Sequence, residues 1–498
     1  MKSGTRNIII VGAVAVVLGG AVFALTKTGG GSSSSSSAAS SSAEIQLISK
    51  SSDNVASMKV TNKKGSYTLV PLPSGSIGAS ASSASSSDSS SSTTYTVKEL
   101  AGCPVNTGET GSVVQNGFSL TATKNLGKVS SLSDYGLTSP QATVSVTFKD
   151  GSTYGYKIGN ATATDSSAYY MCGLESDNVY VVSVDDGLLE DATYFVTKDM
   201  LSISADSSSS STTNGSSSAD FTEIALSGKN FPQATALAKN TSGLLAITAP
   251  RAFDVDTNNL SSLETVLTSL SADSVAAIHP DAAALKKYGL DSPTVKVSFT
   301  AEKKSYVLTV GAKNGKDYYA MVGGVDVVYN VSGDSIANLV SQNLYTLRSK
   351  MIYLPNITTV KQIEISASGK TDVMNVTRTE NAASSTAKEK AYDYKITGNG
   401  GKSLDYDTNY RNVYQTIIGL QVFADTNQVP SGTPAVTVKY TYFDKKNQDT
   451  LALYKVDERR YAAVFNGTVY GLCTESDVQN VLQTVANFEA GKSIASLT

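Results

Sequence analysis

A repeated motif constrains the fold of this chain more than any other feature. Residues 135–140 read YGLTSP, and residues 288–293 read YGLDSP, an offset of 153 residues. Each motif is followed, in the same order, by an alternating apolar run, an apolar-Gly step, a Tyr-Tyr pair and a Val-Tyr pair. Self-similarity in a fixed order is typical of tandem copies of one structural unit. The sequence therefore predicts at least two copies of the same fold.

A fainter third copy follows at an offset of 141 residues. Pro434 and Tyr470 correspond at this offset to Pro293 and Tyr329 of the second copy. The third copy lacks the YGL triplet, so we expect a divergent unit.

The local patterns predict an α+β fold. Residues 221–226 with 244–248, and 360–366 with 392–397, read as strand pairs that precede helices with apolar residues on one face. We expect Asp256 and Asp407 to be the N-caps of these two helices. The alternating runs that follow, separated by Gly-containing turns, predict a meander, and residues 478–488 predict a closing helix. The expected plan is repeated units of antiparallel β-meander with helices packed on one face.

The N-terminus is predicted to be a membrane anchor. Residues 8–25 read IIIVGAVAVVLGGAVFAL, an uncharged stretch near the roughly 20 residues that span a bilayer. Lys2 and Arg6 precede it, so the positive-inside rule places the N-terminus in the cytoplasm and the bulk of the chain outside. A cleaved signal peptide is the alternative, since small residues such as Ala24 could precede a cut.

Composition completes the predicted organisation. Gly- and Ser-rich stretches bury too little apolar surface to fold and serve as tethers or linkers. The predicted parts are a cytoplasmic N-terminus (1–7), a transmembrane helix (8–25), a Ser-rich tether (26–43), a first unit (44–206) with a Ser-rich insert (80–94), a Ser-rich linker (207–219), a second unit (220–354) and a third, divergent unit (355–498).

The motifs together resemble the bacterial domain-of-unknown-function family numbered 4340, over residues 120 to 350. The features shared are the YGLxxP motif, the alternating strand, the apolar-Gly step, the Tyr-Tyr strand, the VYxV strand and a closing helix. The resemblance implies an anchored, exported protein found alongside ABC-type transport components of the kind linked to gliding motility. It supplies no catalytic residues.

Composition also excludes several functions. The formal net charge is −3, without the basic footprint of a protein that binds phosphate backbones, so we expect no nucleic-acid partner. Cys103, Cys172 and Cys473 have no short spacing, which argues against a CxxC pair and against a zinc site built from cysteines. We interpret them as single buried thiols, although one disulfide could form in an oxidising compartment.

Short catalytic motifs occur, but in the wrong context. His279 is the only histidine, and its HPD tripeptide is interpreted as a loop leading into a short helix. The strings KTG (27–29), SDN (176–178) and STAK (385–388) are in the reverse of the order that penicillin-recognising enzymes require. Residues 254–258 lack the Gly and Glu of a calcium loop, and residues 311–316 lack the spacing of a phosphate loop. We assign no catalytic, cofactor or metal residues.

Two functions are consistent with these patterns. The first is a non-catalytic, membrane-anchored extracytoplasmic protein that binds an envelope protein or transporter subunit. The alternative is a wall- or glycan-active module that uses Tyr-rich strands to bind sugars or acidic residues to hydrolyse them. Exposed tyrosines lining a groove would favour the alternative, and the acidic cluster at 185–191 is interpreted as the solvated start of a helix.

Overall fold

The structure is a computed structural model that describes residues 44–72, 93–173, 176–205, 219–385, 390–426, 428–444 and 446–494. The predicted anchor (8–25), the tether, most of the insert at 80–94 and most of the linker at 207–219 lie outside these residues. In the described part of the chain, no helix combines the length and apolar character needed to cross a membrane.

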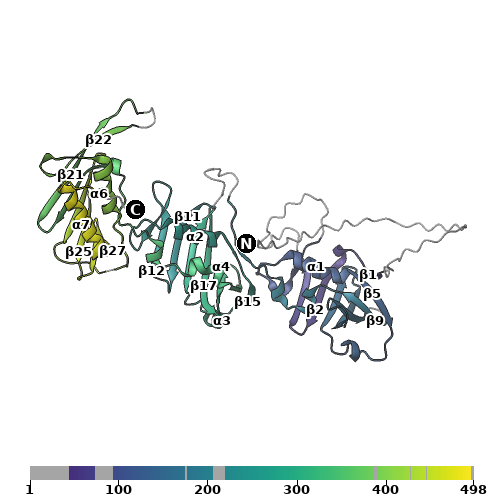
Figure 1. The fold of residues 1–498 in the computed structure, drawn as a ribbon. Coiled ribbons are helices and arrows are strands. Elements are labelled where there is room, and N and C mark those ends of the chain that lie inside the picture. The colour runs from purple at the N-terminus through teal and green to yellow at the C-terminus, as the bar shows by residue number, and fades with distance from the viewer. Residues whose placement is uncertain are drawn as a thin grey trace, which may run out of the picture. The chain divides into compact units, whose positions relative to one another are not determined.

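The described part of the chain forms three large antiparallel sheets and one small one (Figure 1). The first has nine strands in the order β1-β5-β9-β8-β7-β6-β2-β3-β4. Its strands are β1 Ile45–Ser49, β2 Val55–Asn62, β3 Gly65–Pro71, β4 Tyr95–Val97, β5 Ser119–Gly127, β6 Ala142–Phe148, β7 Thr153–Ala161, β8 Ala168–Gly173 and β9 Ser176–Ser183.

The second sheet has eight strands in the order β13-β12-β11-β16-β17-β18-β19-β15. Its strands are β11 Phe221–Gly228, β12 Phe231–Lys239, β13 Leu245–Ala249, β15 Ser274–Ile278, β16 Val295–Ala301, β17 Lys304–Asn314, β18 Asp317–Val322 and β19 Val327–Val331. The small sheet pairs β10 Asp199–Ser202 with β14 Ser269–Ser271.

The third sheet also has eight strands, in the order β23-β22-β21-β20-β24-β25-β26-β27. Its strands are β20 Val360–Ala367, β21 Lys370–Glu380, β22 Tyr392–Thr397, β23 Ser403–Leu404, β24 Val436–Tyr442, β25 Asp449–Lys455, β26 Arg460–Phe465 and β27 Thr468–Thr474.

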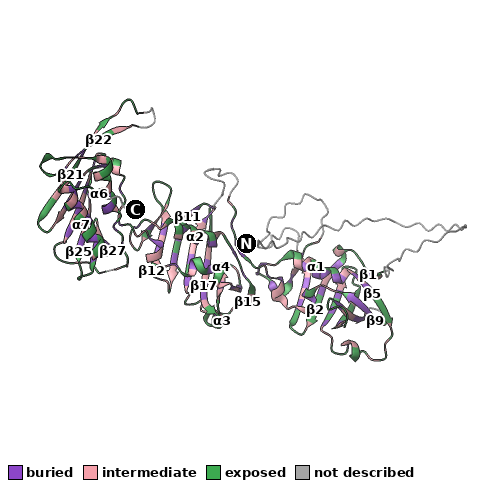
Figure 2. Ribbon diagram, viewed as in Figure 1, coloured by how far each residue is buried: buried purple, intermediate pink, exposed green. Residues whose placement is uncertain are grey.

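Helices accompany each large sheet, as the predicted α+β class requires. The α-helices are α1 Thr107–Phe118, α2 Thr257–Thr268, α3 Ala282–Lys287, α4 Gly333–Val340, α5 Leu344–Leu347, α6 Arg411–Ile418 and α7 Glu475–Glu489. Apolar residues of α1, α2 and α4, and α6 and α7 lie in the same buried cluster as the core-facing strand residues. Buried residues alternate with exposed ones along many strands (Figure 2), because successive side chains point to opposite faces.

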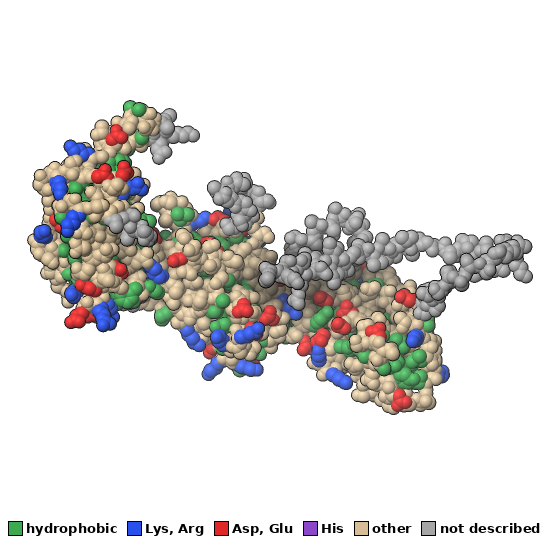
Figure 3. Space-filling model, viewed as in Figure 1, with side chains coloured by type: hydrophobic (Ala, Val, Ile, Leu, Met, Phe, Trp, Pro, Cys, Tyr) green, Lys and Arg blue, Asp and Glu red, His purple; other side chains and the backbone are tan. Residues whose placement is uncertain are grey.

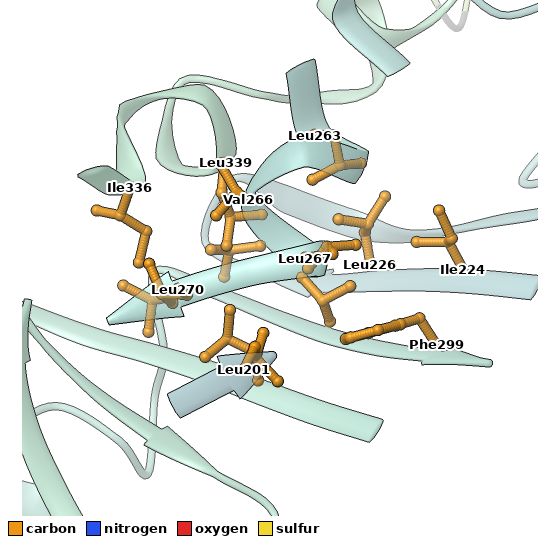
Figure 4. Packing of buried hydrophobic residues seen from close by; sticks show 14 of the residues in the cluster. Leu201, Ile224, Leu226, Leu263, Val266, Leu267, Leu270, Phe299, Ile336 and Leu339 are labelled. Atoms are coloured by element: carbon orange, nitrogen blue, oxygen red, sulfur yellow. The ribbon is translucent and has the colours of Figure 1, made fainter. Parts of the chain in front are cut away.

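Pairing reveals how each unit begins. In the first unit, β1 pairs with β5, the strand that follows helix α1. In the same way β10 pairs with β14, which follows α2, and Leu201 of β10 lies beside Leu267 and Leu270 in the core of the second unit (Figure 4). The Ser-rich stretch at 207–219 therefore follows the opening strand of the second unit instead of separating two complete units.

Three local features differ from the sequence-based expectations. Each predicted strand pair is a triplet, since β12 and β21 lie between the expected strands; β12 carries Pro232, which weakens its strand signal. Helix α6 is preceded by a π-helical turn at Tyr406–Tyr410 whose N-cap is Asp405, so the prediction for Asp407 is wrong. The first unit ends in two 3-10 turns, Asp186–Leu189 and Ala192–Phe195, where a closing helix was expected.

The tyrosines give the core a distinct response to pH. Burial is the main cause that raises the pKa of Tyr95, Tyr353 and Tyr470 to about 12. An unfolded tyrosine titrates near pH 10, so the folded state binds these protons more tightly. The resulting stability is complete below about pH 10 and is lost as the pH rises towards 12. We expect alkaline unfolding in this window, with tyrosinate absorbance appearing together with the loss of β-sheet circular dichroism; full tyrosinate absorbance in a still-folded chain would contradict this.

Candidate functional site

The repeat motifs follow the same order in both units because they contact one another in the folded sheet. These contacts lie on the face of each sheet opposite the helices, here called the outer face. Tyr135 of YGL contacts the ring of Tyr170 edge-on, with centroids 4.8 Å apart. Tyr288 and Tyr319 form the same pair in the second unit, at 4.6 Å. The segment that carries YGL therefore lies across the outer face, held by one aromatic pair.

The apolar-Gly step provides the close contact beneath this segment. A Cβ at Gly159 would lie 2.2 Å from the carbonyl oxygen of Tyr135, and one at Gly311 would lie 2.3 Å from that of Tyr288. Only glycine permits such an approach of two backbones. The YGL motif and the Gly step thus occur together because their backbones contact each other.

A cavity of about 650 Å³ opens on the outer face of the first sheet, beside this contact. It lies between the chain that follows β5 and the strands β6 to β9. Its lining includes Lys128, Val129 and Leu132 from that chain, Thr143 and Ser145 from β6, Gly155 and Lys157 from β7, Cys172 and Gly173 from β8, and Asp177 from β9. Figure 3 shows hydrophobic side chains gathered on the surface of this unit near β9.

Gly155 leaves the floor of this cavity open, whereas Gly173 permits a close approach of two backbones beside it. A Cβ at Gly173, where φ is +116°, would lie 2.8 Å from the carbonyl oxygen of Gly155. The strand register aligns Gly155 with Val307 of the second unit and Gly173 with Val322, because Tyr156 pairs with Gly173 as Leu308 pairs with Val322. Val307 therefore places a side chain in the second unit at the position that Gly155 leaves open in the first.

The chemistry of the cavity fits binding. Lys128 and Asp177 form an exposed ion pair, with Nζ and Oδ2 3.2 Å apart, so each adds little stability and can exchange partners. Lys157, Thr143 and Ser145 are exposed polar residues that line the cavity together with the apolar residues Val129 and Leu132.

The cavity thiol is not activated. Burial raises the pKa of Cys172, and the nearby Lys157 only partly opposes this. A thiol protonated at neutral pH is a weak nucleophile. All three cysteines are buried and free.

His279 lies outside the cavity. Its Nε2 is 3.3 Å from the carbonyl oxygen of Glu99 and 3.9 Å from Sγ of Cys103. Burial raises the pKa of the Cys103 thiol, the opposite of what a Cys-His nucleophile requires. As expected from the sequence, the loop leads into a short helix, which Asp281 caps by accepting from the N–H of Ala284 at 2.7 Å.

The other short motifs also serve structural roles where they are described. Asp256 caps α2 by accepting from the N–H of Asn259 at 3.0 Å, as predicted. Residues 311–314 end β17, and the turn follows at Gly315. SDN (176–178) begins β9, whereas KTG lies outside the described residues, as does most of STAK.

The acidic cluster at 185–191 caps the two 3-10 turns. Asp185 accepts from the N–H of Gly187 and Asp191 from that of Thr193, both at 2.9 Å. Burial raises the pKa of Asp185. Across the described ranges, no group of three His, Cys, Asp or Glu residues is arranged to hold a metal ion.

The sequence analysis missed the outer-face cavity. The signal was present, since Gly155 and Gly173 stand where the second copy has valines. Hydrophobic periodicity does not predict this cavity, because a glycine in a strand has no side chain that would assign it to the apolar or the polar face.

Comparison with known proteins gives one match. The profile of the family described as Domain of unknown function (DUF4340) matches residues 96–238 and 246–413. Both segments begin in the strand before a helix, β4 before α1 and β13 before α2, and both end in the following unit. No curated protein and no solved structure matches the chain.

Proposed function

The chain belongs to the DUF4340 family, of which it carries two matched copies, and from this premise we propose that it is a non-catalytic binding protein of the cell envelope. In this proposal residues 8–25 anchor it in the membrane as a single-pass protein, and the three sheets lie outside the cytoplasm. It acts with a transporter subunit or another envelope protein.

The cavity on the first sheet carries this proposal. Its volume of about 650 Å³ falls within the roughly 300–1,000 Å³ of ligand pockets, and it combines apolar walls with a few polar groups. Nothing that lines it pairs a nucleophile with a base. An extended segment of a partner protein fits such a mixed surface, with apolar side chains against Val129 and Leu132 and charged ones against Lys128 and Asp177.

The glycan-active alternative draws no support from the tyrosines. Tyr169 and Tyr318, which occupy matching positions, pack against the core, and Tyr170 and Tyr319 are covered by their aromatic partners. A sugar-binding platform needs exposed rings, so we place this function second.

The test is crosslinking of the full-length protein in cells, followed by mass spectrometry, for the wild type and Gly155→Val. Valine at 155 copies the second unit and narrows the cavity without a new element. Thr153→Val is the matched control, because Thr153 is an exposed residue of the same strand that does not line the cavity.

We expect the wild type and Thr153→Val to capture the same transporter or envelope protein. Gly155→Val should capture at least about 90% less of that protein, because a loss of about 1.4 kcal/mol in binding free energy weakens the affinity about tenfold. Capture of no envelope protein, or equal capture by all three chains, would reject the proposal. Equal melting temperatures of the two variants show that the loss is not caused by unfolding.

A further inference from the structure

The second unit contacts the first along the end of its sheet formed by β15 and β19. His279 and Asp326, which flank these strands, lie against the loop before helix α1, where Sγ of Cys103 is 3.7 Å from the carbonyl oxygen of Asp326. Burial, and after it the nearby Cys103, raises the pKa of Tyr329 in β19. The 3-10 turn Ala192–Phe195 of the first unit also contacts β15. The first unit therefore covers this end of the second sheet.

The third unit contacts the second through corresponding elements. Nη1 of Arg251, in the loop before helix α2, donates to the carbonyl oxygen of Val469 in β27. The ring of Phe253, in the same loop, lies edge-on to the ring of Tyr470, with centroids 5.0 Å apart. In both cases the loop before a helix lies against the strand of the next unit that carries the Val-Tyr pair.

The two loops correspond residue by residue. Cys103 stands three residues before Asn106, the N-cap of α1, and Phe253 stands three residues before Asp256, the N-cap of α2. The contact is heterologous, because one face of a unit meets a different face of the next. A heterologous contact repeated along an open array leaves one face of each kind free at the two ends.

In the third unit, the loop before the helix is covered by the unit itself. Lys402 stands three residues before the N-cap Asp405, the position that Cys103 and Phe253 hold in the other units. Its Nζ donates to the carbonyl oxygen of Glu489 in α7, at 3.2 Å. Helix α7 has 15 residues, whereas α4 of the second unit has 8. Terminal repeats of tandem arrays carry caps of this kind, and this cap occupies the loop that a further unit would contact.

The corresponding edge of the first unit is exposed. Strand β5 corresponds to β15, since Asn125 pairs with Tyr180 as Val275 pairs with Tyr329. All four residues of Thr123–Leu126 in β5 are exposed, whereas β15 is half-buried from Val275 onwards. Successive side chains of a strand point to opposite faces, so this part of β5 is covered on neither face.

The exposed edge presents an apolar side chain and two charges. Leu126 is 40% exposed. Asp177 corresponds to Asp326, because each stands two residues before the Val-Tyr pair of its unit. The exposed ion pair of Asp177 with Lys128 adds little stability, so either residue can pair with a charge on a docked protein.

We propose that this edge of the first unit, Thr123–Lys128 with Asp177, binds a unit of the same α+β kind that belongs to a separate chain. The loop before the partner's helix lies against β5 and β9, as residues 99–103 lie against the second unit and residues 251–253 against the third. A second copy of this chain does not supply the loop, because each of its three loops already has a contact. The inference rests on the proposed role in protein binding and names the class of partner, but its surface excludes the cavity floor at Gly155.

The test places a photoreactive residue on this edge of the full-length chain, in the cells that express it natively. Leu126→benzoylphenylalanine carries the probe. Leu244→benzoylphenylalanine is the matched control, since Leu244 is 67% exposed in the second unit and takes part in none of the contacts above. After irradiation, mass spectrometry identifies the crosslinked chain and the crosslinked residue. Melting temperatures equal to that of the wild type show that both variants are folded.

We expect the probe at Leu126 to crosslink a separate chain that contains an α+β unit of this kind, at a residue of the loop before a helix. The control at Leu244 should give none of this product. Absence of a product at Leu126 would overturn the inference. Crosslinking to a second copy of this chain, or to a protein without such a unit, would also overturn it.

The cavity and the edge can be tested independently. If Gly155→Val loses its envelope partner and the probe at Leu126 gives no product, the cavity binds a partner and the inference about the edge is wrong. If a chain that carries both Gly155→Val and the probe at Leu126 gives the expected product at unchanged yield, the edge binds its partner without the cavity.

Discussion

Replacing Asp425 with alanine is expected to lower the free energy of unfolding by about 3 kcal/mol, because it leaves Arg348 as a buried charge without its carboxylate. The side chain of Arg348 is fully buried, with 0% of its surface exposed. Its guanidinium lies against the rings of Phe253, Tyr345 and Tyr470, at 4.9 to 5.4 Å from their centroids.

The environment of Arg348 shows why its carboxylate partner matters. Its Nε and Nη1 have no hydrogen-bond partner among the described residues. Burial lowers its pKa, and Asp425 is the foremost group opposing that change. A Cβ at Gly471 would lie 2.9 Å from Nη2, so the site is also tightly packed. The rings compensate part of the charge, but Asp425 supplies the one described carboxylate in ion-pair contact.

A double-mutant cycle separates the loss of charge pairing from the loss of packing. Arg348→Met keeps much of the volume without the charge, and we expect it to change the unfolding free energy by less than about 1.5 kcal/mol. Adding Asp425→Ala to Arg348→Met should then cost far less than about 3 kcal/mol. Denaturant unfolding of the four chains measures this. Equal costs of Asp425→Ala in both backgrounds would show that the pair is not coupled.

Sequence reasoning reached the repeats, the fold class, the cap at Asp256 and the short helix after His279, because these depend on local periodicity and on short-range hydrogen bonds. It missed β12 and β21, whose strand signals are weak, and the π-helical turn that moved one cap to Asp405. It also missed the cavity and the burial of Arg348. These features depend on which residues of different strands and units face each other. Local sequence patterns do not predict this, because it is set by the strand register.

The comparison of copies supplies part of what periodicity lacks. When the register is known, Gly155 against Val307 marks a position that one unit leaves open and another fills. Lys402 against Phe253 marks a loop that one unit covers itself and another places against its neighbour. Repeated units that share a core but differ at such positions can hold different ligands on one scaffold. This makes the third unit, despite its missing YGL motif, as informative as the other two.

The second large effect is expected at Asp449, which is 5% exposed in the core of the third unit. Its Oδ2 accepts from the hydroxyl groups of Tyr353 and Tyr442, at 2.6 and 2.7 Å, and its Oδ1 accepts from Nδ2 of Asn466 at 2.9 Å. One carboxylate thus joins the chain before β20, the end of β24 and the turn between β26 and β27. Each hydroxyl has a single proton, so the 2.8 Å contact between the two tyrosine oxygens cannot replace both bonds.

Asp449→Leu should lower the free energy of unfolding by about 3–5 kcal/mol, because it leaves buried donors unsatisfied at about 1–3 kcal/mol each. Adding Tyr353→Phe and Tyr442→Phe removes two of those donors, and we expect this triple variant to recover part of the lost stability. Tyr442→Phe alone, the matched control, should cost only about 1 kcal/mol, since the carboxylate keeps its other partners. Denaturant unfolding again measures the effect. If the triple variant is less stable than Asp449→Leu, the loss of unfolding free energy arises from lost packing. The hydrogen bonds of the carboxylate would then not be what holds these three segments together.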